Sequence, residues 1–255
     1  PESPDVSPDG RKVVFSALQG GTGDIFMGDL ETKEIVNLTK DAFADAGPTW
    51  SPDGRYVVYL ARVSGNEKLF RVDIDTGRKT QLTFGTHDDT AAKFYNSTTV
   101  LFTSTAIDPA IPITPEIARN ASIPNVWTLD LSTGALKQLT DTMSGNVSPV
   151  VLRTDDVPRV AFVSYYKGQN GINTVAMDRP LTTVASSDFG QPGPIIDFTP
   201  PLGHTLLRDN IKKKGKFERM NLAGRPPVGL GVTCCGNFSG NTEIVGVTSA
   251  GSSID

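Results

Sequence analysis

Short apolar runs recur along the chain and are separated by turns rich in proline, glycine and aspartate. Val13–Phe15 follows the turn Ser7–Gly10, and Val57–Tyr59 follows an identical Ser-Pro-Asp-Gly turn at Ser51–Gly54, 44 positions later. An uninterrupted apolar run, rather than strict alternation, is typical of a strand that is covered on both faces. A repeat of about 40–45 residues made of short strands predicts a β-propeller, in which each repeat is one four-stranded blade.

Each of the two leading repeats predicts the same four strands. A first strand ends at Val6 or Trp50, the turn follows, and the apolar run is the second strand. Proline at the second turn position fixes φ, and glycine at the fourth position suits a type I turn. The third strands, which carry an aromatic residue and an aspartate, are expected at 25–30 and 69–74. The short fourth strands are expected at 35–39 and 80–83.

The third repeat is degenerate and contains an insertion. Phe94–Ser97 stands in place of the turn, Val100–Phe102 is the apolar run, and Val126–Leu131 is the third strand. About 13 extra residues lie somewhere within 105–124. This proline-rich insertion cannot extend a sheet. It is either a binding loop carried by a rigid scaffold or a neutral connection.

A fourth repeat starts at Ser148, and the period is lost after Asp188. In this repeat 155–158 is the turn, Val160–Val163 the buried strand and Thr174–Asp178 the third strand. We therefore expect propeller blades over 1–190 and an irregular, glycine-rich and basic tail over 191–255. Because a closed ring removes exposed sheet edges and most propellers have more than four blades, we expect a partial array. Distorted blades in the tail, or blades of a longer parent protein, would complete it.

Composition narrows the function classes further. The 25 glycines and 18 prolines suit an all-β chain with many turns. A net charge of -4 argues against a general nucleic-acid binder. No apolar run approaches the roughly 18 residues of a membrane-spanning helix. The adjacent pair Cys234-Cys235 is too little for a disulfide scaffold, so we interpret it as incidental thiols, with a redox or metal role as the alternative.

The repeat resembles a known family. Ser-Pro-Asp-Gly-Arg-x-Val-Val-(Phe/Tyr), followed by Ile-Phe-x-x-Asp-Leu and Leu-Thr, is similar to the TolB-type, WD40-like propeller repeat, over residues 1–180. This resemblance implies a periplasmic or outer-membrane-associated protein with a partner of the cell envelope. The same repeat also occurs in the propellers of S9 prolyl oligopeptidases and tricorn-like proteases, so the repeat alone does not fix the function.

The tail carries a second resemblance. Pro200–Thr205, Lys212–Glu218 and Gly224–Val228 are similar to a subgroup of large bacterial envelope proteins. In that subgroup a TolB-like propeller leads into a C-terminal barrel resembling outer-membrane surface antigens. The chain departs from this pattern by ending at Asp255 without room for a barrel, so the resemblance implies attachment to the outer membrane through a longer parent protein.

Two sets of residues are candidate binding sites. Asp45, Asp89 and Asn146 each lie five residues before the end of a first strand. They would form a polar ring at one mouth of the channel that binds a cation or an inserted peptide backbone, or else they cap local turns. The second set is a basic run that would dock to anionic lipid, lipopolysaccharide or an acidic partner, or else faces water. It consists of Lys212, Lys213, Lys214, Lys216 and Arg219.

Motifs for catalysis are not found in the sequence. It contains no Gly-x-Ser-x-Gly, no local Cys–His pattern and no His-Glu-x-x-His. His87-Asp88-Asp89 is a weak metal motif, because adjacent side chains on a strand point to opposite faces. We therefore expect no catalytic residue, no metal site and no cofactor.

The function expected from the sequence is a non-enzymatic interaction or scaffold module of the bacterial cell envelope, which docks a protein or peptide on the propeller face. One alternative is the substrate-gating propeller of an S9 or tricorn-like peptidase. The other is an accessory structural subunit of a larger membrane complex. A peptidase propeller should lead into an α/β-hydrolase domain, whereas this tail is rich in glycine and β-type sequence.

Overall fold

The computed structural model describes residues 2–19, 21–115, 117, 121–152 and 157–195 of the 255. The chain divides into two units, Pro1–Thr199 and Pro200–Asp255, and every described residue belongs to the first. The basic run with Lys212, Lys213, Lys214, Lys216 and Arg219, the pair Cys234-Cys235 and the resemblance in the tail all lie outside the described residues.

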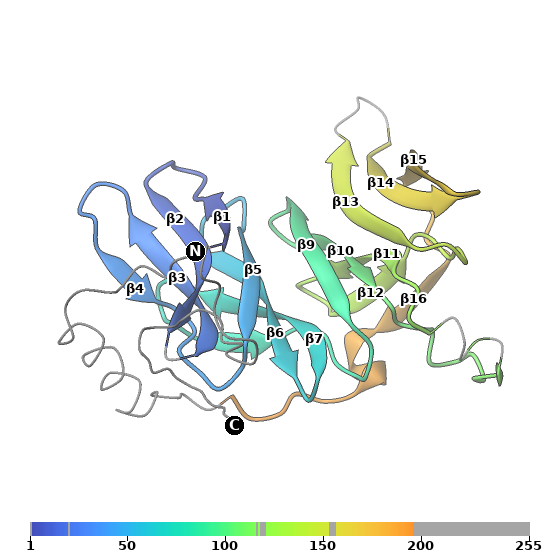
Figure 1. Ribbon diagram of the computed structural model, residues 1–255, viewed down its shortest axis with the longest axis horizontal. Coiled ribbons are helices and arrows are strands. Elements are labelled where there is room, and N and C mark those ends of the chain that lie inside the picture. Colours follow the sequence, from blue (N-terminus) through green and yellow to red (C-terminus); the bar gives the residue numbers. More distant parts are fainter. Residues whose placement is uncertain (1, 20, 116, 118–120, 153–156, 196–255) are drawn as a thin grey trace, which may run out of the picture. The chain divides into compact units, whose positions relative to one another are not determined.

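The described residues form antiparallel β-sheets that correspond to four propeller blades (Figure 1). Blades 1 and 2 are regular four-stranded sheets in the order of the chain. Their strands are β1 (Glu2–Val6), β2 (Lys12–Gln19), β3 (Thr22–Asp29), β4 (Ile35–Asn37), β5 (Asp45–Trp50), β6 (Tyr56–Val63), β7 (Asn66–Asp73) and β8 (Lys79–Gln81). The predicted all-β propeller is therefore confirmed.

Blades 3 and 4 depart from this regular plan. Their strands are β9 (Asp89–Asn96), β10 (Thr99–Ser104), β11 (Asn125–Asp130), β12 (Ala135–Gln138), β13 (Asn146–Leu152), β14 (Arg159–Tyr166), β15 (Gln169–Ala176) and β16 (Thr182–Ala185). The third strand of blade 4 begins five residues earlier than the predicted 174–178, because β15 continues the full hairpin with β14. The described part of the insertion at 105–124 contains no strand, as its prolines predict.

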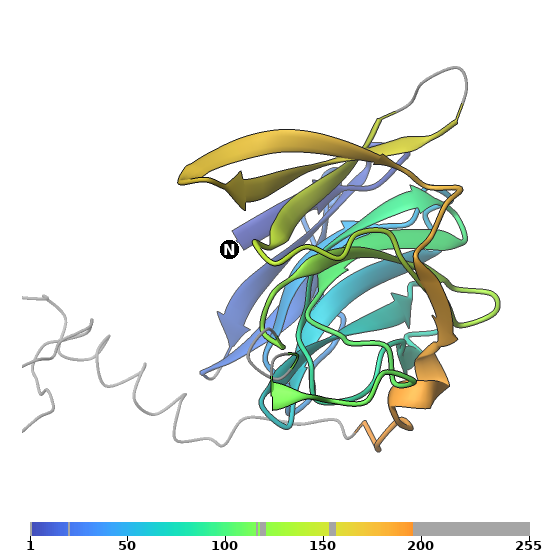
Figure 2. The same ribbon diagram turned by 90° about the vertical axis from the view of Figure 1, so that its right-hand side faces the viewer.

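The last strand, β16, does not complete its own blade. It pairs antiparallel with β12, so that blade 3 has five strands in the order β16-β12-β11-β10-β9, and blade 4 keeps three. The Thr182 hydroxyl also donates a hydrogen bond to Asp108 Oδ2 in the insertion, at 2.7 Å. Figure 2 shows the chain continuing from β16 into the 3₁₀-helix η1 (Ser186–Phe189), where Ser186 Oγ donates to the carbonyl oxygen of Leu82 at 2.6 Å.

The Ser-Pro-Asp-Gly turn is held together by its own side chains. In the second copy, the Gly54 N–H donates to the Ser51 carbonyl at 2.9 Å, and Gly54 has φ +72°, which favours glycine. Ser51 Oγ donates to Asp53 Oδ1 at 2.6 Å and accepts from the Tyr56 N–H at 2.9 Å. Ser7, Asp9 and Lys12 repeat these contacts in the first copy. The motif therefore has a structural role, since its serine and aspartate side chains and its glycine N–H bond to one another or to the residues that follow.

Apolar clusters fill the three junctions between consecutive blades. The apolar runs point alternate side chains to opposite faces, so blades 2 and 3 each contribute to two clusters. A fully buried large apolar side chain contributes about 1.5–3 kcal/mol to folding. Blades 1 and 2 share a cluster around Val14, Ile25, Val57 and Phe70. Blades 2 and 3 share a cluster around Val58, Leu69, Phe102 and Trp127. Blades 3 and 4 share the smallest cluster, around Leu101, Val126, Val160 and Phe162.

Candidate functional site

Each blade junction also contains a buried polar cluster built from three equivalent positions. The first lies near the start of a third strand, the second is a threonine after the fourth strand, and the third opens the next blade. In each cluster the threonine hydroxyl accepts a hydrogen bond from a third-strand N–H, at 3.0, 2.9 and 2.9 Å. The three sets are Asp24, Thr39 and Asp45; Lys68, Thr83 and Asp89; and Asn125, Thr140 and Asn146.

The first junction, between blades 1 and 2, gathers three carboxylates beside one ammonium group. Asp24, Asp41 and Asp45 are 4%, 2% and 3% exposed. Lys79 Nζ donates to Asp41 Oδ2 at 3.1 Å, and Asn37 Nδ2 donates to Asp24 Oδ2 at 2.9 Å. Within the part of the chain that the structure describes, neither oxygen of Asp45 has a hydrogen-bond partner, and Asp24 Oδ1 has none.

Burial dominates the electrostatics of this junction. Burial is the largest cause, and together with the Asp41 and Asp24 carboxylates it raises the pKa of Asp45 to about 8, while the Thr39 hydroxyl and the Lys79 ammonium oppose the shift. Burial likewise raises the pKa of Asp24. Asp45 is therefore largely protonated at neutral pH, because an uncompensated buried carboxylate neutralises rather than remains charged.

Tyr59 adds a further polar group without a partner to the first junction. Its side chain is fully buried, and its hydroxyl makes no hydrogen bond to the described residues. Burial raises the pKa of this phenol, and the nearby Asp45 and Asp41 carboxylates raise it further. Orphaned buried polar atoms are rare in folded proteins, so their concentration at one junction distinguishes it.

The second junction, between blades 2 and 3, replaces the first carboxylate with a lysine. Lys68 Nζ and Asp89 Oδ2 lie 3.2 Å apart, and these side chains are 1% and 0% exposed. His87 Nε2 lies 3.5 Å from the other oxygen of Asp89, and the His87 ring packs edge-on against Phe189. Burial lowers the pKa of Lys68 and of His87. This junction is thus a buried ion pair beside a neutral imidazole.

The third junction, between blades 3 and 4, is uncharged and densely hydrogen-bonded. Asn146 Nδ2 donates to Asn125 Oδ1, Thr140 Oγ1 and Thr142 Oγ1, at 3.0, 3.0 and 2.8 Å. Thr140 Oγ1 and the Thr142 N–H also donate to Asn125 Oδ1, both at 3.0 Å. Two amides and two hydroxyls therefore bond to one another without a net charge, although Asn146 Oδ1 is buried with no partner among the described residues.

The structure places Asp45, Asp89 and Asn146 in equivalent, buried positions of the three junctions, and the hydrogen bonds of Asp89 and Asn146 join them to other side chains rather than to a local turn. A polar ring at a channel mouth and a role of these residues in binding stay predictions. Sequence analysis missed their partners at the first position, although Asp24 and Lys68 are also 44 positions apart.

A metal centre and a membrane-spanning helix are both absent from the described residues. Within the described ranges, no three His, Cys, Asp or Glu side chains are arranged to hold a metal ion, and this includes the three aspartates of the first junction. Nor is any helix there long and apolar enough to cross a bilayer.

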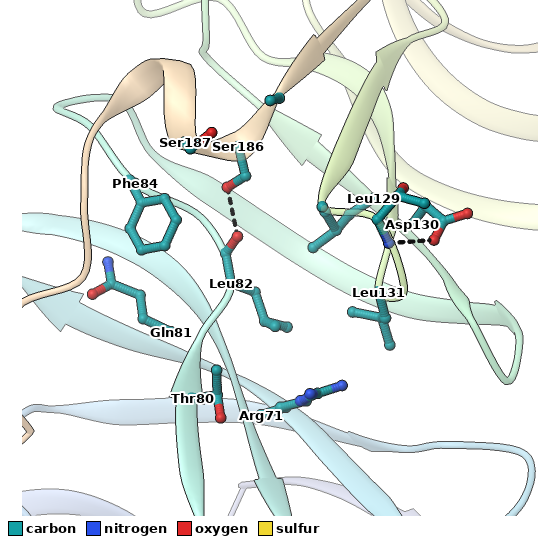
Figure 3. Close-up of a pocket in the computed structure, with 13 residues that line it drawn as sticks. Arg71, Thr80, Gln81, Leu82, Phe84, Leu129, Asp130, Leu131, Ser186 and Ser187 are labelled. Carbon is teal, nitrogen blue, oxygen red and sulfur yellow. Dashed lines mark hydrogen bonds between the residues drawn. The ribbon is translucent and has the colours of Figure 1, made fainter.

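A small groove lies between the outer strands of blades 2 and 3, beside η1 (Figure 3). We call it the η1 groove; its volume is about 270 Å³. Leu82, Leu129 and Leu131 give it an apolar lining, and Arg71 and Asp130 add charge. Asp130 Oδ1 accepts from the N–H groups of residues 132 and 133 in the turn that follows. Arg71, whose guanidinium lies 4.8 Å from the centre of the Tyr56 ring, is the cationic group of the lining.

Comparison with known proteins shows that the leading repeats are similar to those of a known family. Residues 1–114 match the family model of the TolB β-propeller domain. The predicted TolB-type propeller repeat is therefore confirmed. No curated protein matches the sequence.

Solved structures with the same fold include a putative TolB from Agrobacterium tumefaciens, with a TM-score of 0.53 and 19% identity; the match covers 71% of this chain and 64% of that one. A mutant of puromycin hydrolase complexed with PGG is similar at a TM-score of 0.53 and 15% identity, over 77% of this chain and 29% of that one. Hydrazine synthase of Kuenenia stuttgartiensis is similar at a TM-score of 0.51 and 16% identity, over 68% of this chain and 32% of that one.

These likenesses show the fold alone, because TolB and enzymes share it at similar scores. The chain spans 43% of one matching TolB structure and 64% of another.

Proposed function

We propose that this chain, which is built of TolB-type propeller blades, is a non-enzymatic interaction module of the bacterial cell envelope. It is periplasmic or associated with the outer membrane. Its partner is a protein or an extended peptide segment, docked on the propeller. The match of residues 1–114 to the TolB β-propeller domain carries this proposal. Rigid blades with connecting loops and edges at the surface suit recognition of a partner.

The η1 groove is the docking site that we favour within this module. About 270 Å³ is below the roughly 300–1,000 Å³ of small-molecule pockets, and it suits one or two anchor side chains of a partner segment. Leu82 and Leu131 would contact an apolar anchor, and Arg71 would pair with an acidic neighbour. The basic run at Lys212–Lys214, Lys216 and Arg219 is a second predicted contact, to an anionic partner.

Photo-crosslinking in the native bacterium tests this function. A crosslinking amino acid replaces Thr80 or Leu131 in the η1 groove, and Met143, an 81% exposed loop residue, is the matched control. Cell fractionation first locates the protein. We expect one dominant envelope protein to be crosslinked from the groove positions and not from the control.

Three outcomes would contradict the proposal. Location of the protein in the cytoplasm would remove the envelope role. Equal crosslinking from the groove and from Met143 would remove the groove as the docking site. Capture of short peptides together with a covalently linked hydrolase domain would support the peptidase-gating alternative instead.

A further inference from the structure

The third and fourth strands of blades 1, 2 and 3 are joined by the same tight turn. In each turn, the aspartate that ends the third strand accepts two backbone N–H groups through its Oδ1 atom. The residue four positions later donates its N–H to the carbonyl oxygen of that aspartate, at 2.8–3.0 Å. This donor has a φ between +68° and +75°, a region that glycine adopts most easily. The pairs are Asp29 and Lys33, Asp73 and Gly77, and Asp130 and Gly134.

Blade 4 replaces both members of this pair. Its third strand, β15, ends at Ala176, which has no side-chain acceptor, and Pro180 stands four positions later. A proline has no N–H to donate, and its ring holds φ near −65° rather than in the positive region. The turn that would return the chain along β15 therefore cannot form.

The next strand, β16, nevertheless has the spacing of a fourth strand. Five residues separate β15 from β16, as five separate β7 from β8. In blades 1, 2 and 3, a threonine accepts the N–H of a third-strand residue 14 positions earlier, as Thr83 does for Leu69. The equivalent of Leu69 in blade 4 is Ile172, because each lies five positions before the residue whose N–H bonds to the residue preceding the second strand. Ser186, which also carries a hydroxyl, stands 14 positions after Ile172.

The structure places these residues on blade 3 instead. Thr183 of β16 pairs with Lys137 of β12. The Ser186 hydroxyl donates to the carbonyl oxygen of Leu82, which belongs to blade 2. A strand that is spaced for blade 4 is thus taken up at the outer edge of blade 3.

This diversion supplies one wall of the η1 groove. The residues at and after the end of β16, Ala185, Ser186 and Ser187, line the groove. Figure 3 shows Ser186 and Ser187 at the end of the groove away from Arg71. If β16 paired with β15, Ser186 would lie beside Ile172, and the groove would lose this wall.

We propose that Pro180 is a positioning residue: by excluding the turn after β15, it sends β16 to blade 3 and so builds the η1 groove. The hydrogen bonds from Thr182 to Asp108 and from the Leu181 N–H to the Gln138 carbonyl then hold the diverted strand. The placement of β16 does not depend on the docking function proposed above. Only the use of the finished groove by a partner rests on that function.

Disulfide trapping in the full chain reports which blade holds β16. Opposite residues of antiparallel strands lie close enough for a disulfide bridge. Lys137→Cys with Thr183→Cys therefore reports pairing with blade 3. Thr174→Cys with Thr183→Cys reports pairing with β15, in the register that Arg71 and Thr80 have in blade 2. Mass spectrometry of a proteolytic digest identifies the bridge, and we expect only 137–183 while Pro180 is present.

Two further changes keep the trapping experiment clear. The native thiols, Cys234 and Cys235, are replaced by serine in every variant. Arg71→Cys with Thr80→Cys is the control pair, and its bridge should form in every background in which the blades fold.

Restoring the turn should move the strand. Ala176→Asp together with Pro180→Gly supplies the side-chain acceptor and a donor that adopts positive φ, so the 174–183 bridge should replace the 137–183 bridge. Ala176→Asp alone is the matched control and should keep 137–183, because Pro180 still excludes the turn. A double variant that keeps 137–183 or forms neither bridge would overturn the proposal. So would movement of the strand in Ala176→Asp alone.

Photo-crosslinking separates the construction of the groove from its use. From Thr80, the double variant should lose the crosslinked partner that the wild type captures, because one wall of the groove has moved. Crosslinking that persists after the strand has moved would overturn the role of Pro180 in building a docking site. A wild type that captures no partner would remove the docking function, while the bridges still decide the position of β16.

Discussion

The first and third blade junctions occupy equivalent places in the repeat, but the polar groups that they bury differ in charge and in hydrogen bonding. In the third, Asn125 and Asn146 share their hydrogen bonds with threonine hydroxyls and carry no charge. In the first, the equivalent residues are Asp24 and Asp45, and three of their four carboxylate oxygens have no partner within the described residues.

The difference teaches that the repeat fixes where polar groups are buried but not how they are satisfied. An amide both donates and accepts, so two amides can complete each other's hydrogen bonds. Two ionised carboxylates only accept, and each needs a donor or a proton. The first junction should therefore respond to pH, while the third should not.

The largest effect is expected from Asp45→Asn. The pKa of Asp45 is about 8 in the folded protein and 3.8 in the unfolded chain. The folded state thus binds the proton more tightly, so the stabilisation is complete below about pH 4 and is lost as pH rises through about pH 8. At about 1.4 kcal/mol per pKa unit, the loss is at most about 6 kcal/mol.

Asparagine at position 45 should remove this dependence, because its amide carries no charge and can donate to the orphaned Asp24 Oδ1. Urea unfolding from pH 4 to pH 8 measures the free energy of unfolding of the variant and of the wild type. The difference between the two at each pH gives the contribution of Asp45. His87, whose lowered pKa acts in the opposite direction below about pH 6.5, affects both proteins equally. Asp75→Asn, at an exposed turn, is the control; a pH profile of Asp45→Asn that parallels the wild type would contradict the expectation.

Asn146→Asp should have the next largest effect, by giving the third junction the chemistry of the first. It removes the amide donor that serves three acceptors and places a carboxylate against the oxygens of Asn125 and Thr140. We expect a loss of about 3 kcal/mol at pH 7, measured as a lower urea midpoint. Asn170→Asp, on the exposed strand β15, controls for the added charge, and equal midpoints for the two variants would refute the prediction.

Tyr59→Phe should have the smallest effect. The Tyr59 hydroxyl has no partner among the described residues, so its removal should leave stability unchanged or raise it by up to about 1 kcal/mol. Thr140→Val in the third junction is the matched comparison, because it removes an acceptor of the Val126 N–H and should cost about 1–2 kcal/mol. Equal losses in thermal unfolding would show that the Tyr59 hydroxyl is bonded after all.

Sequence patterns predicted the blades well because their local chemistry repeats. Ser51, Asp53 and Gly54 each have a role in one turn, so the same letters recur wherever that turn does. The apolar runs are predictable for a similar reason, since each is buried on both faces between blades. Equivalent positions at 45, 89 and 146 could be recognised from spacing alone.

The partners in the junctions were not predictable, because the first position changes from Asp24 to Lys68 to Asn125. Its conserved feature is burial, which a single sequence does not display when the residue type changes. The pairing of β16 was equally hidden. Thr182–Ala185 follows the third strand of blade 4 at the spacing of a fourth strand, and only tertiary contacts with Gln138 and Asp108 assign it to blade 3.

That pairing sets an order for synthesis on the ribosome. Blade 3 receives its outermost strand only after all three strands of blade 4 have emerged, because β16 follows them in the chain. Until then, β12 is the outermost strand of its sheet and can template pairing with another nascent chain. A message truncated before the codon for Thr182 would therefore yield a protein with both of its last two blades open at their outer edges.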